Sequence, residues 1–233
     1  MKDTEYEALQ LKALICPEQA RWPKPDVQYD NSGDTPTMSG AHWQRLHAAV
    51  DEARERTAQA WAYMTEIEKN PDLSTQGKER QQRKVAMEAI AEFEKSQALG
   101  KAREVVHRQL AKYAEKVGVA VKAPTNIHEA TVQAQIRDRL ASMKTGRMDF
   151  LKKQVANPMI AAAILTAPAF LSGMSDEETA FVKKTVEQHV APEVVEDRDA
   201  TMKAMQQAEK GWQKALDKIA ERGGLTKGPE GTW

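Results

Sequence analysis

The residues that could carry out chemistry are few and are scattered along the chain. Glu104 and His107 have the Glu-x-x-His spacing that places a carboxylate and an imidazole on one face of a helix, as in di-iron bundles. A di-iron site needs a second Glu-x-x-His pair and further bridging glutamates, and no other histidine follows a glutamate by three residues. We therefore interpret this pair as a chance match and predict that the chain has no metal site.

Nucleophilic and nucleotide-binding motifs are missing from the sequence. Cys16, the single cysteine, stands next to a proline without a neighbouring histidine, so we expect a small apolar residue rather than a nucleophile. His42 and His47 are five residues apart, which is a poor spacing for joint metal ligation on a helix. The motifs GxxxxGKS/T, GxGxxG and GxSxG are all absent. The sequence therefore predicts a protein that is not an enzyme and binds no cofactor.

The composition is that of a folded helical protein. Hydrophobic residues make up 41% and charged residues 29% of the 233, while aromatic residues make up only 6%. Ala, Gln, Glu, Lys and Met are abundant, and these side chains lose little rotamer freedom in a helix. The first ten residues are acidic rather than signal-like, and the longest apolar run, 158–171, is too short to span a bilayer. We therefore expect an all-α protein without a signal peptide or a membrane span.

An extended arm is expected near the amino terminus. Residues 3–15 have the apolar spacing of a short helix, which a proline ends. Residues 17–38 contain four prolines among Asn, Asp, Ser and Gly, which favours a loop or an extended segment. Trp22 and Tyr29 lie within it, and a free linker would rarely carry both. We therefore predict that residues 1–38 form a helix and a proline-rich arm, in which Trp22 and Tyr29 contact a neighbouring surface.

Two long helices are expected to form an antiparallel hairpin within residues 39–122. The first covers 39–70 and the second 74–117, and the short connection between them favours antiparallel packing. Along the first helix, apolar and small residues repeat at alternating steps of three and four, which is the spacing of a coiled-coil seam. The seam consists of Trp43, Leu46, Val50, Ala53, Thr57, Ala60, Met64 and Ile67.

A bundle of shorter helices, followed by one long helix, is expected over residues 123–222. The apolar stretch 158–171 could belong to the core of this bundle or to an interface, and the sequence leaves both open. Residues 223–233 are expected to form a flexible tail. Prolines, glycines and capping residues divide the bundle into helices at 124–143, 148–156, 175–189 and 192–222, with an apolar helix that starts at Pro158.

Charge is segregated along the chain although its formal net charge is zero. Residues 1–70 carry a net charge of −4, residues 71–174 carry +7 and residues 175–233 carry −3. A basic middle could neutralise acidic surface, its own or a neighbour's, or it could bind phosphates. Acidic residues interrupt each basic cluster and no helix-turn-helix or stacking motif accompanies them, so a solvated face is favoured over nucleic-acid binding. The candidate basic patch is Arg80, Arg83, Lys84, Arg103, Arg108, Lys112, Arg137, Arg139 and Arg147.

The block NPMIAAAILTAPAFLSGMSDEE is followed by a long helix rich in Ala, Lys, Glu and Gln. Over residues 157–222 this pattern resembles uncharacterised helical proteins encoded among the structural genes of tailed bacteriophages and prophages. The resemblance lies in the general order and composition of the elements, and it assigns no catalytic residue to any position of this chain. It implies a virion or assembly component, made in the cytoplasm of a bacterial host.

Two functional hypotheses follow from the sequence. The first is a helical structural protein that acts in several copies, as a head, neck or internal virion component or as a scaffold, with itself or other virion proteins as partners. The heptad spacing, the charge segregation and the aromatic residues of the arm favour it. The alternative is a binding regulator, an adaptor or inhibitor that grips a nucleic acid or a host enzyme through the basic middle segment.

Overall fold

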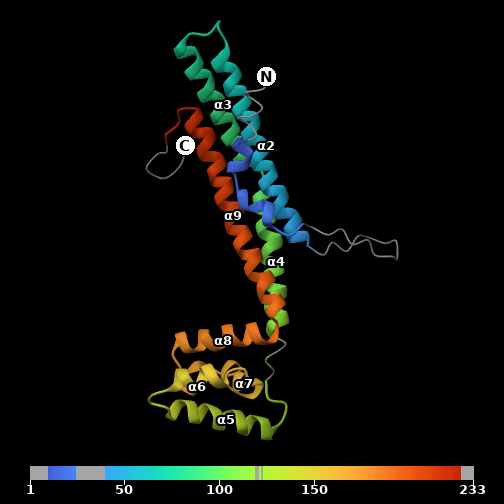
Figure 1. Cartoon of the computed structure of the whole chain (residues 1–233), viewed down its shortest axis with the longest axis vertical. Coiled ribbons are helices and arrows are strands. Elements are labelled where there is room, and N and C mark those ends of the chain that lie inside the picture. Colours follow the sequence, from blue (N-terminus) through green and yellow to red (C-terminus); the bar gives the residue numbers. More distant parts are fainter. Residues whose placement is uncertain (1–9, 25–39, 119–120, 122, 227–233) are drawn as a thin grey trace, which may run out of the picture. The chain divides into compact units, whose positions relative to one another are not determined.

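The chain is helical throughout the part that the structure describes. The computed structural model describes residues 10–24, 40–118, 121 and 123–226, and every regular element within these ranges is a helix (Figure 1), so the all-α prediction is confirmed. The elements are η1 (Pro17–Arg21), α2 (Ala41–Lys69), α3 (Thr75–Lys95), α4 (Ala98–Gly118), α5 (Ile127–Ser142), α6 (Arg147–Gln154), α7 (Pro158–Leu165), η2 (Ala169–Ser172), α8 (Asp176–Val190) and α9 (Pro192–Arg222).

The antiparallel hairpin predicted for the first half of the chain is confirmed. α2 and α3 lie against each other and run in opposite directions (Figure 1). α2 stops before Pro71, which cannot continue a helix. α3 begins where the hydroxyl of Ser74 accepts a hydrogen bond from the N–H of Gly77, at 3.2 Å. Across the pair, Gln82 Nε2 donates to the carbonyl of Met64 at 3.1 Å.

The second long helix, expected as one element over 74–117, is interrupted after α3. The hydroxyl of Ser96 accepts a hydrogen bond from the N–H of Ala98 at 3.2 Å and donates one to Glu52 Oε1 on α2 at 2.7 Å. A serine hydroxyl that binds a nearby backbone N–H competes with the helical ladder. The expected helix is therefore two elements, α3 and α4, with the break held against α2.

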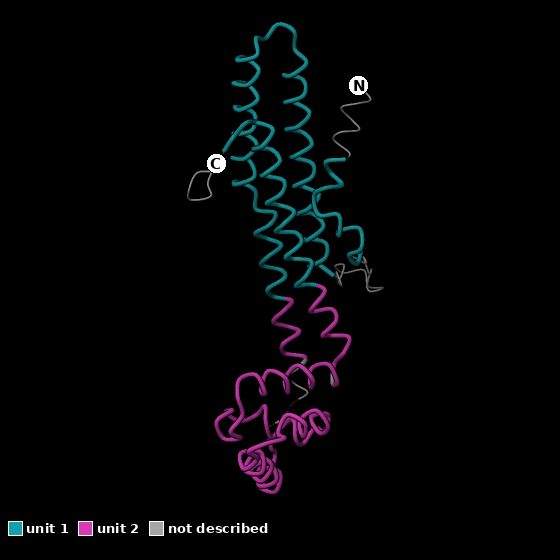
Figure 2. The backbone as a smooth tube through the Cα atoms, turned by 60° about the vertical axis from the view of Figure 1, so that its left-hand side comes forward, with its two compact units in different colours: residues 1–108, 201–233 teal, residues 109–200 magenta. Residues whose placement is uncertain are grey.

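The described chain divides into two compact units (Figure 2). Unit 1 contains residues 1–108 and 201–233, and unit 2 contains residues 109–200. These boundaries fall inside α4 and α9, and they differ from the divisions expected at 122 and 222. The reason for the difference is that the carboxyl-terminal half of α9 packs with the hairpin helices.

The core of unit 1 lies between α2, α3, α4 and α9. The rings of Phe93 on α3 and Trp212 on α9 meet edge to face, with centroids 5.0 Å apart. At the end of α9 the backbone approaches α3 so closely that a β-carbon on Gly223 would lie 2.2 Å from the Cβ of Ala86. Figures 1 and 2 both show α9 running beside the hairpin. Unit 1 is therefore a helical bundle that joins the chain's first half to its last turns.

Unit 2 has a separate hydrophobic core built by α5 to α8. The apolar stretch 158–171 contributes α7, whose Ala161 to Ile164 are buried, so this part of the stretch is core. Phe170 and Leu171 in η2 are exposed instead. No helix of the described ranges is long and apolar enough to cross a membrane. The buried cluster consists of Leu140, Leu151, Val155, Ala161, Ile164, Met174, Val182 and Val186.

Candidate interaction surfaces

In the described ranges, the residues that could carry out chemistry do not gather into one cluster. Glu104 and His107 are both exposed on α4. Across the described ranges, no group of three His, Cys, Asp or Glu side chains is placed to hold a metal ion. Burial, with a smaller effect from Glu18, raises the pKa of the buried Cys16 thiol from 9.0 to about 11. Its thiolate form is therefore scarce at neutral pH, which agrees with an apolar packing role.

Arg54 of α2 makes three of the contacts that fix the amino-terminal segment, residues 10–24, to α2. Arg54 donates from Nε to the carbonyl of Ile15 and from Nη2 to the carbonyl of Cys16, each at 2.9 Å. Its third nitrogen, Nη1, donates to the side-chain oxygen of Gln19. Ile15 is fully buried beneath this network. The guanidinium thus satisfies carbonyls where the segment turns into η1, and it holds the turn on the bundle.

The same turn packs closely against α9 at Gly211. Cys16 has a left-handed backbone with φ of 53°, the one non-glycine residue with positive φ among those described. A β-carbon on Gly211 would lie 2.8 Å from the Cβ of Cys16, closer than two side chains approach. Glycine in a helix interior costs about 1 kcal/mol relative to alanine. Close approach of the amino-terminal segment explains why α9 has a glycine there.

Trp22 is buried against its own chain rather than presented to a neighbour. Its indole N–H donates to Gln207 Oε1 on α9 at 2.9 Å. Its ring lies 6.5 Å from that of Trp43 and 5.5 Å from that of His47, measured between centroids. This placement differs from the predicted contact with a neighbouring surface, because α2 and α9 already bury the ring. Tyr29, the other aromatic residue of the expected arm, lies outside the described residues.

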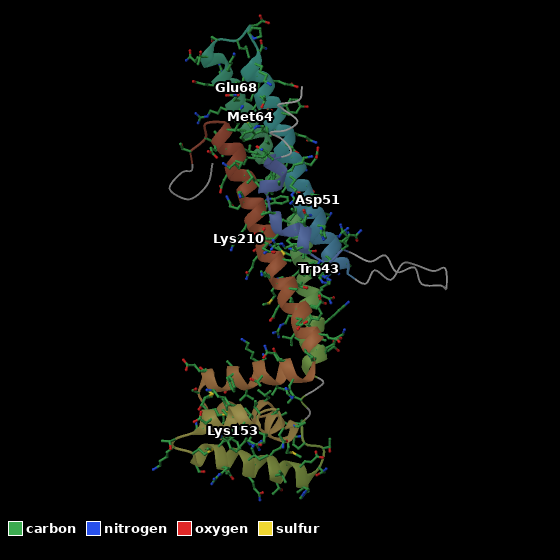
Figure 3. All side chains as sticks on the ribbon, in the orientation of Figure 1. Trp43, Asp51, Met64, Glu68, Lys153 and Lys210 are labelled. Atoms are coloured by element: carbon green, nitrogen blue, oxygen red, sulfur yellow. The ribbon has the colours of Figure 1, made fainter. Side chains whose placement is uncertain are left out.

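The predicted seam of α2 faces the bundle interior over most of its length. Trp43 and Met64, labelled in Figure 3, are buried near the two ends of α2, and Leu46 and Val50 are buried between them. Ile67, in the last turn, is only partly buried. The small middle positions are enclosed as well, and Thr57 satisfies its buried hydroxyl by donating to the carbonyl of Ala53 at 2.7 Å. Burial of Ala53, Thr57 and Ala60 is complete or nearly so.

Arg147, predicted as part of a basic patch, is a structural residue of unit 2. Its guanidinium donates to the carbonyls of Leu140 and Met143 at 3.0 Å each and to that of Gly173 at 2.5 Å. It also pairs with Glu178 at 3.1 Å, in the capping box that starts α8. These carbonyls lie at the end of α5 and in the turn after η2, and that of Leu140 also accepts from the N–H of Met143 at 3.1 Å. Arg147 therefore joins three elements and is not directed at a phosphate.

Two further arginines of the predicted patch have partners in their own unit. Arg103 on α4 pairs with Glu209 on α9 at 2.7 Å. Arg137 on α5 donates to the carbonyl of Ala163 in α7 at 3.2 Å. Of the nine basic residues, these two and Arg147 thus have partners within their own units. Those that remain exposed are Arg80, Arg83 and Lys84 on α3, Arg108 and Lys112 on α4, and Arg139 on α5.

The outer side of the α2–α3 hairpin is hollowed by a groove of about 340 Å³. Its floor is apolar, with Ala60 from α2 and Val85 and Ala89 from α3. Tyr63 stands at its edge with 62% of its surface exposed, and Met87 on α3 is 57% exposed. Arg56 closes one end, where it pairs with Glu52 and Glu92.

Several residues that fix the fold were not singled out by sequence reasoning. Arg54 and Gly211 hold the amino-terminal segment, and neither lies in a recognisable motif. A glycine in the interior of a long expected helix was the available signal, because such a position usually has a packing reason. No comparable signal marks Arg54, whose partners are backbone carbonyls distant in sequence.

Models of protein families, curated proteins and solved structures gave no match to this chain.

Proposed function

We propose that this chain is a non-enzymatic helical structural protein that assembles with itself, and with other proteins, into a larger complex. The resemblance of residues 157–222 to helical proteins of tailed phages makes a virion component or a scaffold the specific form of this proposal. The observation that carries it is the outer side of the α2–α3 hairpin. There, Tyr63 is exposed at an apolar groove, although the hairpin has buried its seam, and Met87 is exposed on another side of α3.

The physical argument concerns the free energy of the exposed apolar surface. Burying apolar surface contributes about 25 cal/mol per Å². On a monomer, Tyr63 leaves 62% of its surface exposed to water. A partner that covers the groove would bury this large side chain and increase its contact area. Exposed apolar surface that borders a hollow and is rimmed by charges is typical of protein–protein contact sites. Arg56, Glu88 and Glu92 provide that rim here.

The placement of the basic residues supports assembly over the alternative, a regulator that binds nucleic acid. Polyanion binding needs several cations free to face one phosphate backbone. Arg103, Arg137 and Arg147 are already engaged with carboxylates or carbonyls of their own unit. The exposed cations that remain are spread over α3, α4 and α5. This distribution favours weak binding to nucleic acid at most.

Sedimentation velocity of the purified full-length chain over a wide concentration range tests the proposal. We expect a concentration-dependent shift from monomer to a defined oligomer, together with no retention on duplex or single-stranded DNA at low salt. A chain that stays monomeric at every concentration and enters no partner complex contradicts the proposal. Tight retention on DNA that falls steeply with salt supports the regulator instead.

A further inference from the structure

α3 has a second ordered face in addition to the one it buries. Its core face consists of Ala86, Ile90 and Phe93, which are buried. A neighbouring flank of the helix follows alternating steps of four and three, which keeps its side chains in one line along the helix. This line is hereafter the outer stripe: Arg80, Lys84, Met87, Ala91 and Glu94, all exposed except the partly buried Ala91.

Charge changes sign halfway along α3. The amino-terminal half of α3 contributes Arg80, Arg83 and Lys84, and the carboxyl-terminal half contributes Glu88 and Glu94. Met87, an uncharged and exposed residue, stands at the change of sign. Lys95 is the basic residue of the acidic half, and it pairs with Glu92 at 3.1 Å. Glu79 is the acidic residue of the basic half, and it lines the cleft between α3 and the end of α9 together with Arg80 and Arg83.

These charged side chains form only weak ion pairs within the chain. Lys84 approaches Glu88 at 3.8 Å, and both side chains are largely exposed. An exposed pair of this kind contributes about 0.5 kcal/mol at most on a helix. The charges of the outer stripe are therefore available to a partner.

We propose that the outer stripe of α3 is a contact surface for a second copy of this chain, packed antiparallel about a two-fold axis at Met87. In that arrangement, residues at equal distances on either side of Met87 stand opposite one another. Arg80 of each copy then faces Glu94 of the other, and the basic half of each α3 lies along the acidic half of its partner. A two-fold contact uses each pair twice, as isologous interfaces do.

A second copy is favoured as the occupant because the surface is complementary to itself. A helix whose charge changes sign at its midpoint matches its own antiparallel image, whereas a parallel copy would bring like charges together. A nucleic acid would be repelled by the acidic half of the same stripe. The uncharged Met87 on the two-fold axis lets two helices approach without burying an unpaired charge at the centre of the contact. This inference rests on the proposed function, since it names the surface through which self-assembly begins.

The test is charge reversal followed by charge exchange in the full-length chain. Arg80→Glu and Glu94→Arg each replace two attractive pairs of the two-fold contact with two repulsive ones. We expect each variant to raise the dissociation constant at least tenfold, measured by sedimentation equilibrium at low salt. The double variant Arg80→Glu/Glu94→Arg exchanges the partners and should restore the constant to within about threefold of the wild type. Lys112→Glu, an exposed reversal on α4, is the matched control, and circular dichroism checks that all variants are folded.

The possible results separate the surface from the proposed function. Weakening by both single variants with restoration by the double variant supports the outer stripe. Oligomers that form equally well in all variants overturn the outer stripe as the contact but leave self-assembly in place. Weakening by the single variants without restoration by the double variant overturns the antiparallel register. A wild-type chain that is monomeric throughout overturns both the stripe and self-assembly.

Discussion

The contact between the amino-terminal segment and α9 predicts that Gly211→Ala destabilises unit 1. Alanine normally stabilises a helix interior relative to glycine by about 1 kcal/mol. Here the added β-carbon would lie 2.8 Å from the Cβ of Cys16, and relieving such overpacking costs about 1–3 kcal/mol. The two effects oppose each other, and we expect a net loss of about 1 kcal/mol.

A second substitution isolates the clash from the helix propensity. Cys16→Gly removes the β-carbon that Gly211→Ala would meet, and it places glycine where the backbone has a φ of 53°. In the Cys16→Gly background the clash is absent and only the higher helix propensity of alanine remains. Gly211→Ala should therefore stabilise unit 1 by about 1 kcal/mol there. The double-mutant cycle therefore predicts a coupling free energy of about 2 kcal/mol.

Urea unfolding followed by tryptophan fluorescence measures the free energy of unfolding of unit 1, which contains both substitutions. Residues 109–200 contain no tryptophan, so the signal reports unit 1. Gly100→Ala on α4 is the matched control, because a β-carbon there meets nothing within 4 Å and the change should stabilise. Equal stabilisation by Gly211→Ala and Gly100→Ala would refute the close approach as the reason for Gly211.

Three further predictions concern the other contacts. Gly223→Ala should cost unit 1 about 2 kcal/mol in the same urea assay, because its β-carbon would lie 2.2 Å from that of Ala86, and an unchanged midpoint would contradict this packing. Arg147→Met should cost unit 2 about 3 kcal/mol by far-ultraviolet circular dichroism, since three backbone carbonyls lose a donor; a loss below about 0.5 kcal/mol would mean that water replaces it. The Cys16 thiol, with a pKa raised to about 11, should resist alkylation at pH 8 and react faster in Arg54→Met, in which the amino-terminal segment loosens. Equal rates in the two proteins would show that Arg54 does not hold the segment.

The raised pKa of Cys16 also fixes the direction of a pH effect on stability. The folded thiol keeps its proton to a higher pH than the unfolded thiol, which ionises near 9.0. Its contribution to stability is therefore complete below pH 9 and is lost as the pH rises toward about 11.

Local signals were enough to predict the elements of the fold. Pro71 ends α2, Ser74 caps α3, and Pro158 opens α7, and each acts through its own backbone chemistry. The break at Ser96 was not predicted; its hydroxyl binds the N–H of Ala98 and is held in place by a hydrogen bond to Glu52, a residue 44 positions earlier. Long-range partners of this kind leave no periodic trace in the sequence.

The candidate surfaces were predicted less well, for the same physical reason. The seam from Trp43 to Met64 follows from heptad spacing, and the structure buries it. The role of Arg147 does not follow from its charge, because an arginine that binds phosphate and one that binds carbonyls have the same residue type. Trp22 was assigned to a neighbour because the sequence could not show that α9 returns to cover it.

The most direct test of the account mixes the two charge-reversed chains. Arg80→Glu and Glu94→Arg should each associate at least tenfold more weakly than the wild type when they are alone. In an equimolar mixture, each Arg80→Glu copy meets a Glu94→Arg copy, and both opposing pairs of the two-fold contact become attractive. Sedimentation equilibrium of the mixture should therefore show a heterodimer with a dissociation constant close to the wild-type value. A mixture that associates no better than either variant alone contradicts self-assembly through the outer stripe of α3.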